Sequence, residues 1–179
     1  MMRRQYRLII TLGLTCLTAV CDVGSAEQND ATRDAPASES EFTLPAPPQK
    51  SNLLPFYVSA TTTLDFAIDA KSLSVSSDGI VRYTMVVTSK SGASNVSFEG
   101  LRCATGEKKL YATGRPDGSW SPSRLDAWLP VIELSTNRQH AALMKDYFCD
   151  GSSVLGKTEV IIERLRRQKS LNGYADKRY

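Results

Sequence analysis

The clearest pattern in the chain is the alternation of apolar and polar residues over residues 80–88. Val81, Tyr83 and Met85 fall on one face of an extended strand, whereas Arg82 and Thr84 fall on the other. This alternation is typical of an antiparallel strand with one buried face and one solvated face. We therefore expect a half-buried strand here, with the odd-numbered residues facing the core.

Two hairpins are predicted around this region. Gly92 favours a turn after the first strand, and residues 95–103 return with apolar residues alternating against polar ones. Further on, residues 109–113 and 119–121 flank a turn in which Pro116 presets one dihedral angle. The sequence thus predicts at least four antiparallel strands.

The pattern changes to a helical one shortly before Cys149. Leu143 and Tyr147 are spaced four residues apart, and so are Met144 and Phe148. This spacing places both pairs on one side of a helix of about three turns that ends at Cys149. The predicted fold class is therefore α+β, an antiparallel sheet packed by this helix.

The start of the chain is a predicted signal peptide. Arg3, Arg4 and Arg7 precede the apolar residues 8–21, and small residues follow up to Ala26. This order predicts export, with cleavage near Ala26 and a soluble protein in the periplasm or cell envelope. A lipoprotein is the alternative interpretation, with Cys21 or Cys16 as the lipid-bearing residue. We favour cleavage, because neither cysteine follows the small residue that lipoprotein processing requires.

The mature chain is divided by composition into three parts. Residues 27–50 are acidic and rich in Ala, Ser and Pro, which predicts a disordered linker. Residues 51–155 are predicted to form a single disulfide-crosslinked α+β domain. Residues 156–179 are basic and predict an amphipathic C-terminal helix and tail.

Charge argues against nucleic-acid binding. Loss of residues 1–26 removes three of the 22 basic residues and one of the 19 acidic residues, which leaves 19 against 18. A nearly neutral protein lacks the basic excess that a nucleic-acid partner requires. Only the basic tail suggests a partner, which would be an anionic lipid surface, peptidoglycan or another envelope protein.

Cys103 and Cys149 are predicted to form one disulfide, because two cysteines remain after the leader in an oxidising compartment. The bond would join the end of a central strand to the end of the helix. Closing a loop of this length contributes at most about 4 kcal/mol in the chain-entropy description.

Several short stretches resemble the cryptic neisserial protein family. They are DGIVRY at residues 78–83, NVSFEGLRC at residues 95–103, NR at residues 137–138 and DYFC at residues 146–149, together with Tyr111, Trp120, Trp128, His140 and Leu143. The resemblance implies an exported bacterial protein without an assigned activity, and it implies no catalytic residue. A weaker architectural likeness links the chain to the surface adhesin E family, in which a late helix backs an antiparallel sheet.

Candidate chemistry is sparse. His140 is the only histidine, so a zinc site of several imidazoles is excluded, and no nucleophile elbow, redox cysteine pair or phosphate-binding glycine loop is present. Glu99 and Asp146 could act as a carboxylate pair. We expect no cofactor, no metal and no enzymatic activity.

Three aromatic residues are the candidate binding site. Trp120, Trp128 and Tyr111 could form a patch suited to stacking on a sugar or a peptide, although such residues more often pack in a core. We therefore expect a non-enzymatic periplasmic binding or structural module. The alternatives are a surface adhesin that binds a macromolecule, an envelope-polymer hydrolase that uses His140 or the carboxylate pair, and an inhibitor of a lytic enzyme.

Overall fold

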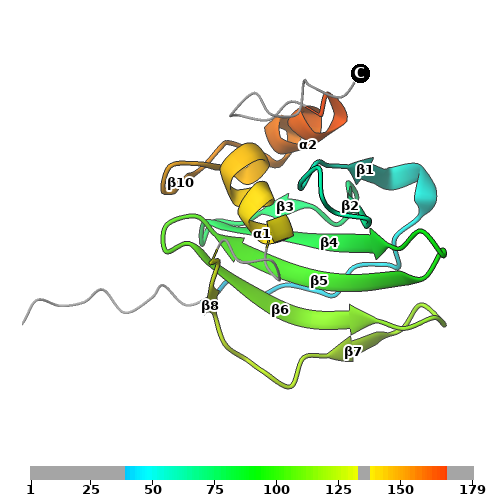
Figure 1. Cartoon of the computed structure of the whole chain (residues 1–179). Helices are drawn as coiled ribbons and strands as arrows, with labels where there is room; N and C mark the ends of the chain where they lie inside the picture. Colours follow the sequence, from blue (N-terminus) through cyan, green and yellow to red (C-terminus); the bar gives the residue numbers. More distant parts are fainter. Residues whose placement is uncertain (1–38, 133–137, 169–179) are drawn as a thin grey trace, which may run out of the picture. The chain divides into compact units, whose positions relative to one another are not determined.

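In the computed structural model, residues 39–132 and 138–168 are described (Figure 1). The predicted signal peptide, the start of the predicted linker and the end of the C-terminal tail lie outside these residues. No helix in the described part is both long enough and apolar enough to cross a membrane.

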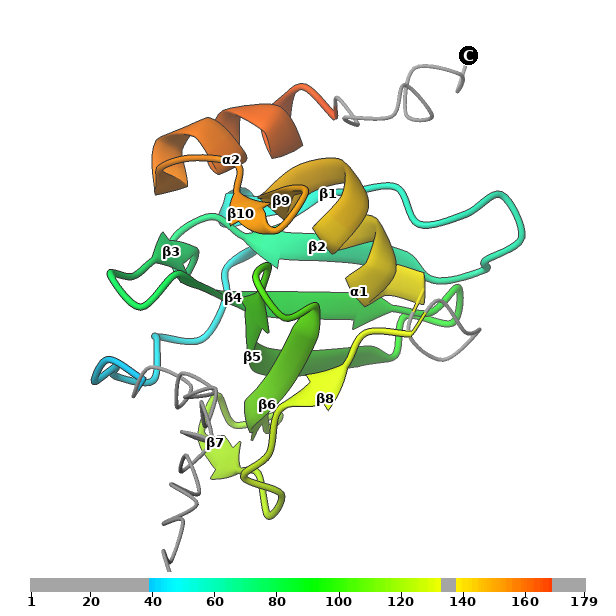
Figure 2. The same cartoon turned by 90° about the vertical axis from the view of Figure 1, so that its left-hand side faces the viewer.

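One antiparallel sheet forms the centre of the domain. Its main path is β1 (Leu53–Pro55), β2 (Asp65–Asp69), β4 (Ile80–Thr88), β5 (Ser94–Arg102), β6 (Glu107–Gly114) and β7 (Trp120–Pro122). Two short strands pair beside this path, β3 (Ser74–Val75) with β4 and β8 (Leu129–Pro130) with β6. The short 3-10 helix η1 (Lys50–Asn52) precedes β1. Figure 2 shows β7 and β8 next to different parts of β6.

Both predicted hairpins are confirmed. All nine residues of β4 pair with β5, from Ile80 with Arg102 to Thr88 with Ser94. β6 and β7 pair across the turn that contains Pro116. Gly118 in this turn has a φ of +83°, a conformation that glycine adopts without steric strain.

The predicted helix before Cys149 is also present. It consists of α1 (Arg138–Ala142) and a π-helical continuation, η3 (Leu143–Phe148). A small hairpin of β9 (Cys149–Asp150) and β10 (Ser153–Val154) leads to the basic helix α2 (Thr158–Arg166). Figure 1 shows both helices on the same side of the sheet, which we call the helix face.

The hydrophobic core lies between the helix face and these helices. Val81, Tyr83 and Met85 of β4 belong to it, as the alternation predicted, and so do Ile161 and Leu165 of α2, which are fully buried. Two aromatic pairs of the core pack edge to face, Tyr83 on Phe148 with a centroid distance of 5.1 Å and Phe56 on Tyr147 with a distance of 5.9 Å. The C-terminal helix is thus docked on the domain.

The predicted disulfide is present between Cys103 and Cys149, with a Cα–Cα distance of 5.7 Å. Cys103 follows the last residue of β5, and Cys149 follows the last residue of η3. The bond therefore joins the sheet to the helix that covers it.

The expectation of a half-buried β4 is wrong. Arg82 is 1% exposed and Thr84 is fully buried, although both point away from the helices. The cover over Arg82 comes from residues 39–49, which we call the covering segment. In Figure 1 this light-blue segment passes behind the strands, across what we call the segment face of the sheet. The sequence assigned residues 39–50 to a disordered linker, but in the structure they lie against the sheet. A composition typical of disorder does not prevent a segment from becoming ordered on a surface that binds it.

Candidate functional site

The candidate site is the segment face with the covering segment on it. The segment has no regular secondary structure and pairs with no strand of the described sheet. It is held instead by contacts at Glu39, at Phe42, at Pro45 and at the backbone of Ser40. Contacts of this kind, made by side chains at intervals along an extended chain, resemble those that bind a peptide in a groove.

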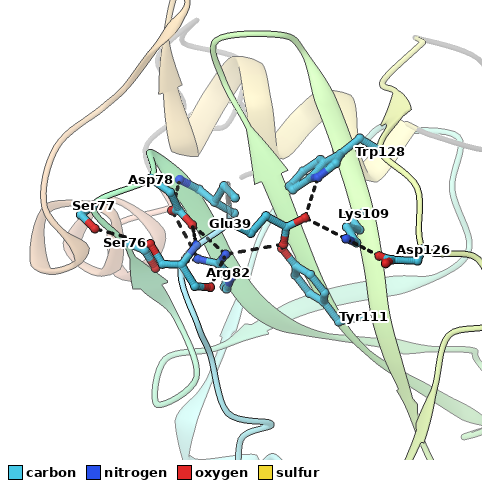
Figure 3. Close-up of polar contacts among 11 residues, drawn as sticks. Glu39, Ser76, Ser77, Asp78, Arg82, Lys109, Tyr111, Asp126 and Trp128 are labelled. Carbon is cyan, nitrogen blue, oxygen red and sulfur yellow. Dashed lines mark hydrogen bonds and ion pairs between the residues drawn. The ribbon is translucent and has the colours of Figure 1, made fainter. Parts of the chain in front are cut away.

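Glu39 is held by four side chains from the sheet and the loop beyond it (Figure 3). Its carboxylate accepts hydrogen bonds from Lys109 Nζ at 2.8 Å, Trp128 Nε1 at 2.8 Å and Tyr111 Oη at 2.9 Å. Arg82 Nη2 lies 3.7 Å from the same carboxylate. This set of donors is specific for a carboxylate, because it supplies N–H and O–H groups to both oxygens.

The electrostatics of Glu39 follow from these contacts. Burial by itself would raise the pKa of Glu39, but the hydrogen bonds from Lys109, Trp128 and Tyr111 outweigh it and lower that pKa. The reverse holds for Tyr111, whose pKa is raised by burial and by the bond to Glu39. Glu39 is therefore ionised and Tyr111 is a neutral donor at neutral pH.

Phe42 occupies the next position. Its ring lies 4.4 Å from the ring of Tyr111 and 5.8 Å from that of Phe98, measured between centroids. The guanidinium of Arg82 lies 5.2 Å from the Phe42 centroid, within the range of a cation–π contact. The segment face thus binds one aromatic ring between two other rings and a guanidinium group.

The third contact is made by Trp120. Its Nε1 donates a hydrogen bond to the carbonyl oxygen of Pro45 at 2.7 Å, and its ring packs near Phe98. Proline and the residues near it favour an extended conformation, so the segment loses little conformational entropy when it is held straight. Both tryptophans of the chain therefore donate hydrogen bonds to the covering segment.

Arg82 and Asp78 form the polar centre of the face. Arg82 Nη2 lies 2.8 Å from Asp78 Oδ2, and Arg82 Nη1 donates to Ser76 Oγ at 2.7 Å. The same pair binds the backbone of Ser40, because Ser40 N donates to Asp78 and Ser40 O accepts from Arg82. Burial tends to raise the pKa of Asp78, but its bonds to Arg82 and to backbone N–H groups lower it from 3.8 to about 2.

A β-bulge directs Tyr111 to this face. Phe98 pairs with Ala112 and Glu99 pairs with Leu110, so Tyr111 is the extra residue of β6. Gly100 on β5 makes room for its ring, since a Cβ atom there would lie 2.7 Å from Tyr111 Oη. Tyr111 and Lys109 are two residues apart, and both reach the carboxylate of Glu39 from this face.

The three predicted binding residues, Trp120, Trp128 and Tyr111, all contact the covering segment. All three are partly exposed, so they lie between the extremes of core and open surface. The sequence interpretation did not identify Glu39, Phe42 and Arg82. The only signal was the single phenylalanine in a segment otherwise poor in large apolar residues.

The candidate catalytic residues lie on the opposite face. His140 Nε2 lies 2.7 Å from Glu99 Oε2, and Glu99 also accepts hydrogen bonds from Tyr83 and Ser97. The side chains of His140 and Glu99 are only 3% and 9% exposed. Asp146 lines a surface pocket with Arg138 and Lys145. Within the described residues, no three His, Cys, Asp or Glu side chains are grouped closely enough to hold a metal ion.

The fold and the site together define a class of protein: a disulfide-linked α+β domain whose sheet carries helices on one face and an extended segment of its own chain on the other. Residues 32–166 match the model of the CNP1-like family, and the chain belongs to this family of bacterial proteins. The match includes the covering segment and ends at the last residue of α2. No curated protein and no solved structure matches the chain.

Proposed function

We propose that this protein is an exported, non-enzymatic binding module of the bacterial cell envelope. Its recognition surface is the segment face, and its ligand is an extended polypeptide segment with a carboxylate followed three residues later by an aromatic ring. The observation that carries the proposal is the seating of Glu39 and Phe42 of the protein's own chain on this face.

The geometry favours a peptide ligand over a substrate. The face provides a carboxylate site, an aromatic seat and an indole donor for a backbone carbonyl, and these are means of holding a chain rather than of cleaving it. His140, in contrast, is a buried residue of α1 and is bonded to Glu99 of β5. This supports a binding role over the hydrolase alternative.

Export is supported by the leader and by the disulfide. A structural disulfide persists in oxidising compartments and is rare in a reducing cytoplasm. The cell envelope is therefore the compartment in which we place the partner.

The covering segment competes with any partner, because it is attached to the domain. A tethered ligand has an effective concentration of about a millimolar, so an added peptide must displace it. The apparent affinity for the added peptide is the intrinsic affinity multiplied by the fraction of molecules in which the face is open. Weakening the segment should therefore strengthen binding of a peptide added in trans.

The test uses the purified, oxidised protein and a labelled peptide of residues 39–49. We expect the variant E39Q/F42A to bind this peptide at least about tenfold more tightly than the unaltered protein, because its own segment no longer holds the face. Fluorescence anisotropy gives the affinity. Intrinsic fluorescence reports displacement, since both tryptophans contact the segment.

The matched control is E41Q/L44A, which makes the same kinds of change at neighbouring exposed positions of the segment. It should bind the peptide as the unaltered protein does, and a peptide that lacks its Glu39 and Phe42 side chains should not bind to any variant. Equal affinity of E39Q/F42A and the unaltered protein would show that the segment is a fixed part of the fold and would refute the proposal.

A further inference from the structure

A pocket of about 950 Å³ lies between the covering segment and the sheet, beside the contacts just described. Residues 41–49 form one wall, and the opposite wall comes from the region of Asn52, residues 69–76 and Arg82. The volume is at the upper end of the range of small-molecule sites, about 300–1,000 Å³. The pocket shares Phe42, Phe98 and Arg82 with the proposed peptide contacts, but Gln49, Asn52, Lys71 and Ser74 of its lining take no part in them.

The lining of the pocket combines neutral and charged polar side chains with two aromatic rings. Amide, hydroxyl, carboxylate and cationic groups come from Gln49, Asn52, Asp69, Lys71, Ser74 and Arg82. The rings of Phe42 and Phe98 add apolar area. A ligand that matches this lining has many hydroxyl groups, which can both donate and accept, and has apolar C–H faces that stack on rings.

The lining has no excess of positive charge. Glu41 and Asp69 oppose Lys71 and Arg82, and the guanidinium of Arg82 is already paired with Asp78. An anionic ligand would therefore gain no net attraction there. This favours a neutral ligand over an anion such as a phosphate.

One buried donor in the lining has no partner. Arg82 is 1% exposed, and its Nε has no hydrogen-bond partner among the described residues, although both of its Nη atoms are bonded. Leaving a buried donor unbonded costs stability, so such groups are rare in folded proteins. This Nε is itself closed off from the pocket, so a ligand hydroxyl would reach it only after a shift of the guanidinium.

We propose that this pocket binds a neutral, polyhydroxylated ligand, namely a short glycan segment of the kind that envelope polymers expose. The site goes beyond the proposed peptide recognition, because it takes a different ligand in the space left between the segment and the sheet. Since the covering segment forms one wall, glycan binding should favour the seated segment. The coupling is reciprocal, so a seated segment should strengthen glycan binding by the same factor.

Calorimetric titration of the oxidised protein with chitotriose and with maltotriose tests the site. We expect saturable binding of at least one trisaccharide; a preference for chitotriose would indicate an N-acetylated amino-sugar polymer, and a preference for maltotriose would indicate an unacetylated glycan. Ser74→Tyr fills the pocket from the exposed first residue of β3 and should weaken binding at least about tenfold. Ser153→Tyr is the matched control, at the exposed first residue of β10, and should leave binding unchanged.

A second, smaller substitution tests the same pocket in case Ser74→Tyr does not fold. Asn52→Ala removes a lining amide but keeps the backbone bonds of Asn52 to Gln49 and Ala70, so it should fold and bind about fivefold more weakly or worse. Absence of saturable binding to both sugars would overturn the proposal, and so would binding that Ser74→Tyr leaves intact. Either result leaves the peptide assay unaffected, so the two proposals can fail separately.

Discussion

His140 shows how one buried side chain can decide whether a carboxylate is tolerated in the core. Glu99 lies beneath the helices, where burial raises its pKa, yet the bonds from His140 and Ser97 outweigh burial and lower that pKa. Removing one partner of a buried hydrogen-bonded pair typically costs several kcal/mol, because the other partner remains desolvated.

We expect His140→Ala to destabilise the protein by about 3 kcal/mol at pH 7. His140→Gln keeps an N–H donor within reach of Glu99 and should lose at least about 1 kcal/mol less. Urea unfolding of both variants measures the difference. An equal loss in the two variants would mean that packing volume, rather than the bond to Glu99, determines the effect.

At the scale of single residues the sequence was informative about the core and uninformative about the segment face. The alternation in β4 placed Val81, Tyr83 and Met85 correctly. It also implied that Arg82 faces solvent, because charged residues are rarely buried without a partner. The partner, Asp78, is only four residues away, but nothing in the alternation shows that a distant segment covers both.

Among the elements, the helix of α1 and η3 depends on the sheet through a covalent bond as well as through packing. The disulfide closes a loop with a sequence separation of 46 residues. Chain-entropy arithmetic gives it an upper contribution of about 4 kcal/mol, a large part of the net stability of about 5–15 kcal/mol that domains usually have.

Reduction, or the double variant C103S/C149S, should therefore lower the free energy of unfolding by about 2–4 kcal/mol, the usual size of such an effect. Urea unfolding with and without reductant gives the value, and mass spectrometry after alkylation confirms the thiol count. The reductant should not affect C103S/C149S, which controls for other actions of the reagent. An unaltered protein that unfolds identically in both conditions would contradict the prediction.

The elements that the sequence predicted are those with a strong local pattern. The hairpins and the helix before Cys149 have alternation, turn residues or spacing by four, and all of them are present. The covering segment has the composition of a linker, and its order depends on Lys109, Tyr111 and Trp128, some 70 to 90 residues later. The β-bulge at Tyr111 could not be predicted either, because the sequence of β6 shows no break in its pattern.

For the molecule as a whole, carboxylates on both faces of the sheet make stability depend on acidity. The pKa of Asp78 is lowered on the segment face, and the pKa of Glu99 is lowered on the helix face. A carboxyl whose pKa is lower in the folded state stabilises it above the unfolded pKa, and this contribution disappears as the pH falls through the folded pKa. The protein should thus lose stability below about pH 4.5, the ordinary pKa of a glutamate.

Asp78 permits a quantitative test, because its pKa falls from 3.8 to about 2 on folding. The difference corresponds to about 2 kcal/mol, present above pH 4 and lost between pH 4 and pH 2. Asp78→Asn should therefore be less stable than the unaltered protein by about 2 kcal/mol at pH 7, and the gap should close towards pH 2. Urea unfolding at pH 7, 4, 3 and 2 measures this difference, with the exposed Asp65→Asn as the control.

A difference in stability that stays constant over this pH range would assign the effect of Asp78 to its neutral hydrogen bonds. The segment that Asp78 holds through Ser40 would then remain seated in acid, and the tryptophan signal that reports on it would not change as the pH falls.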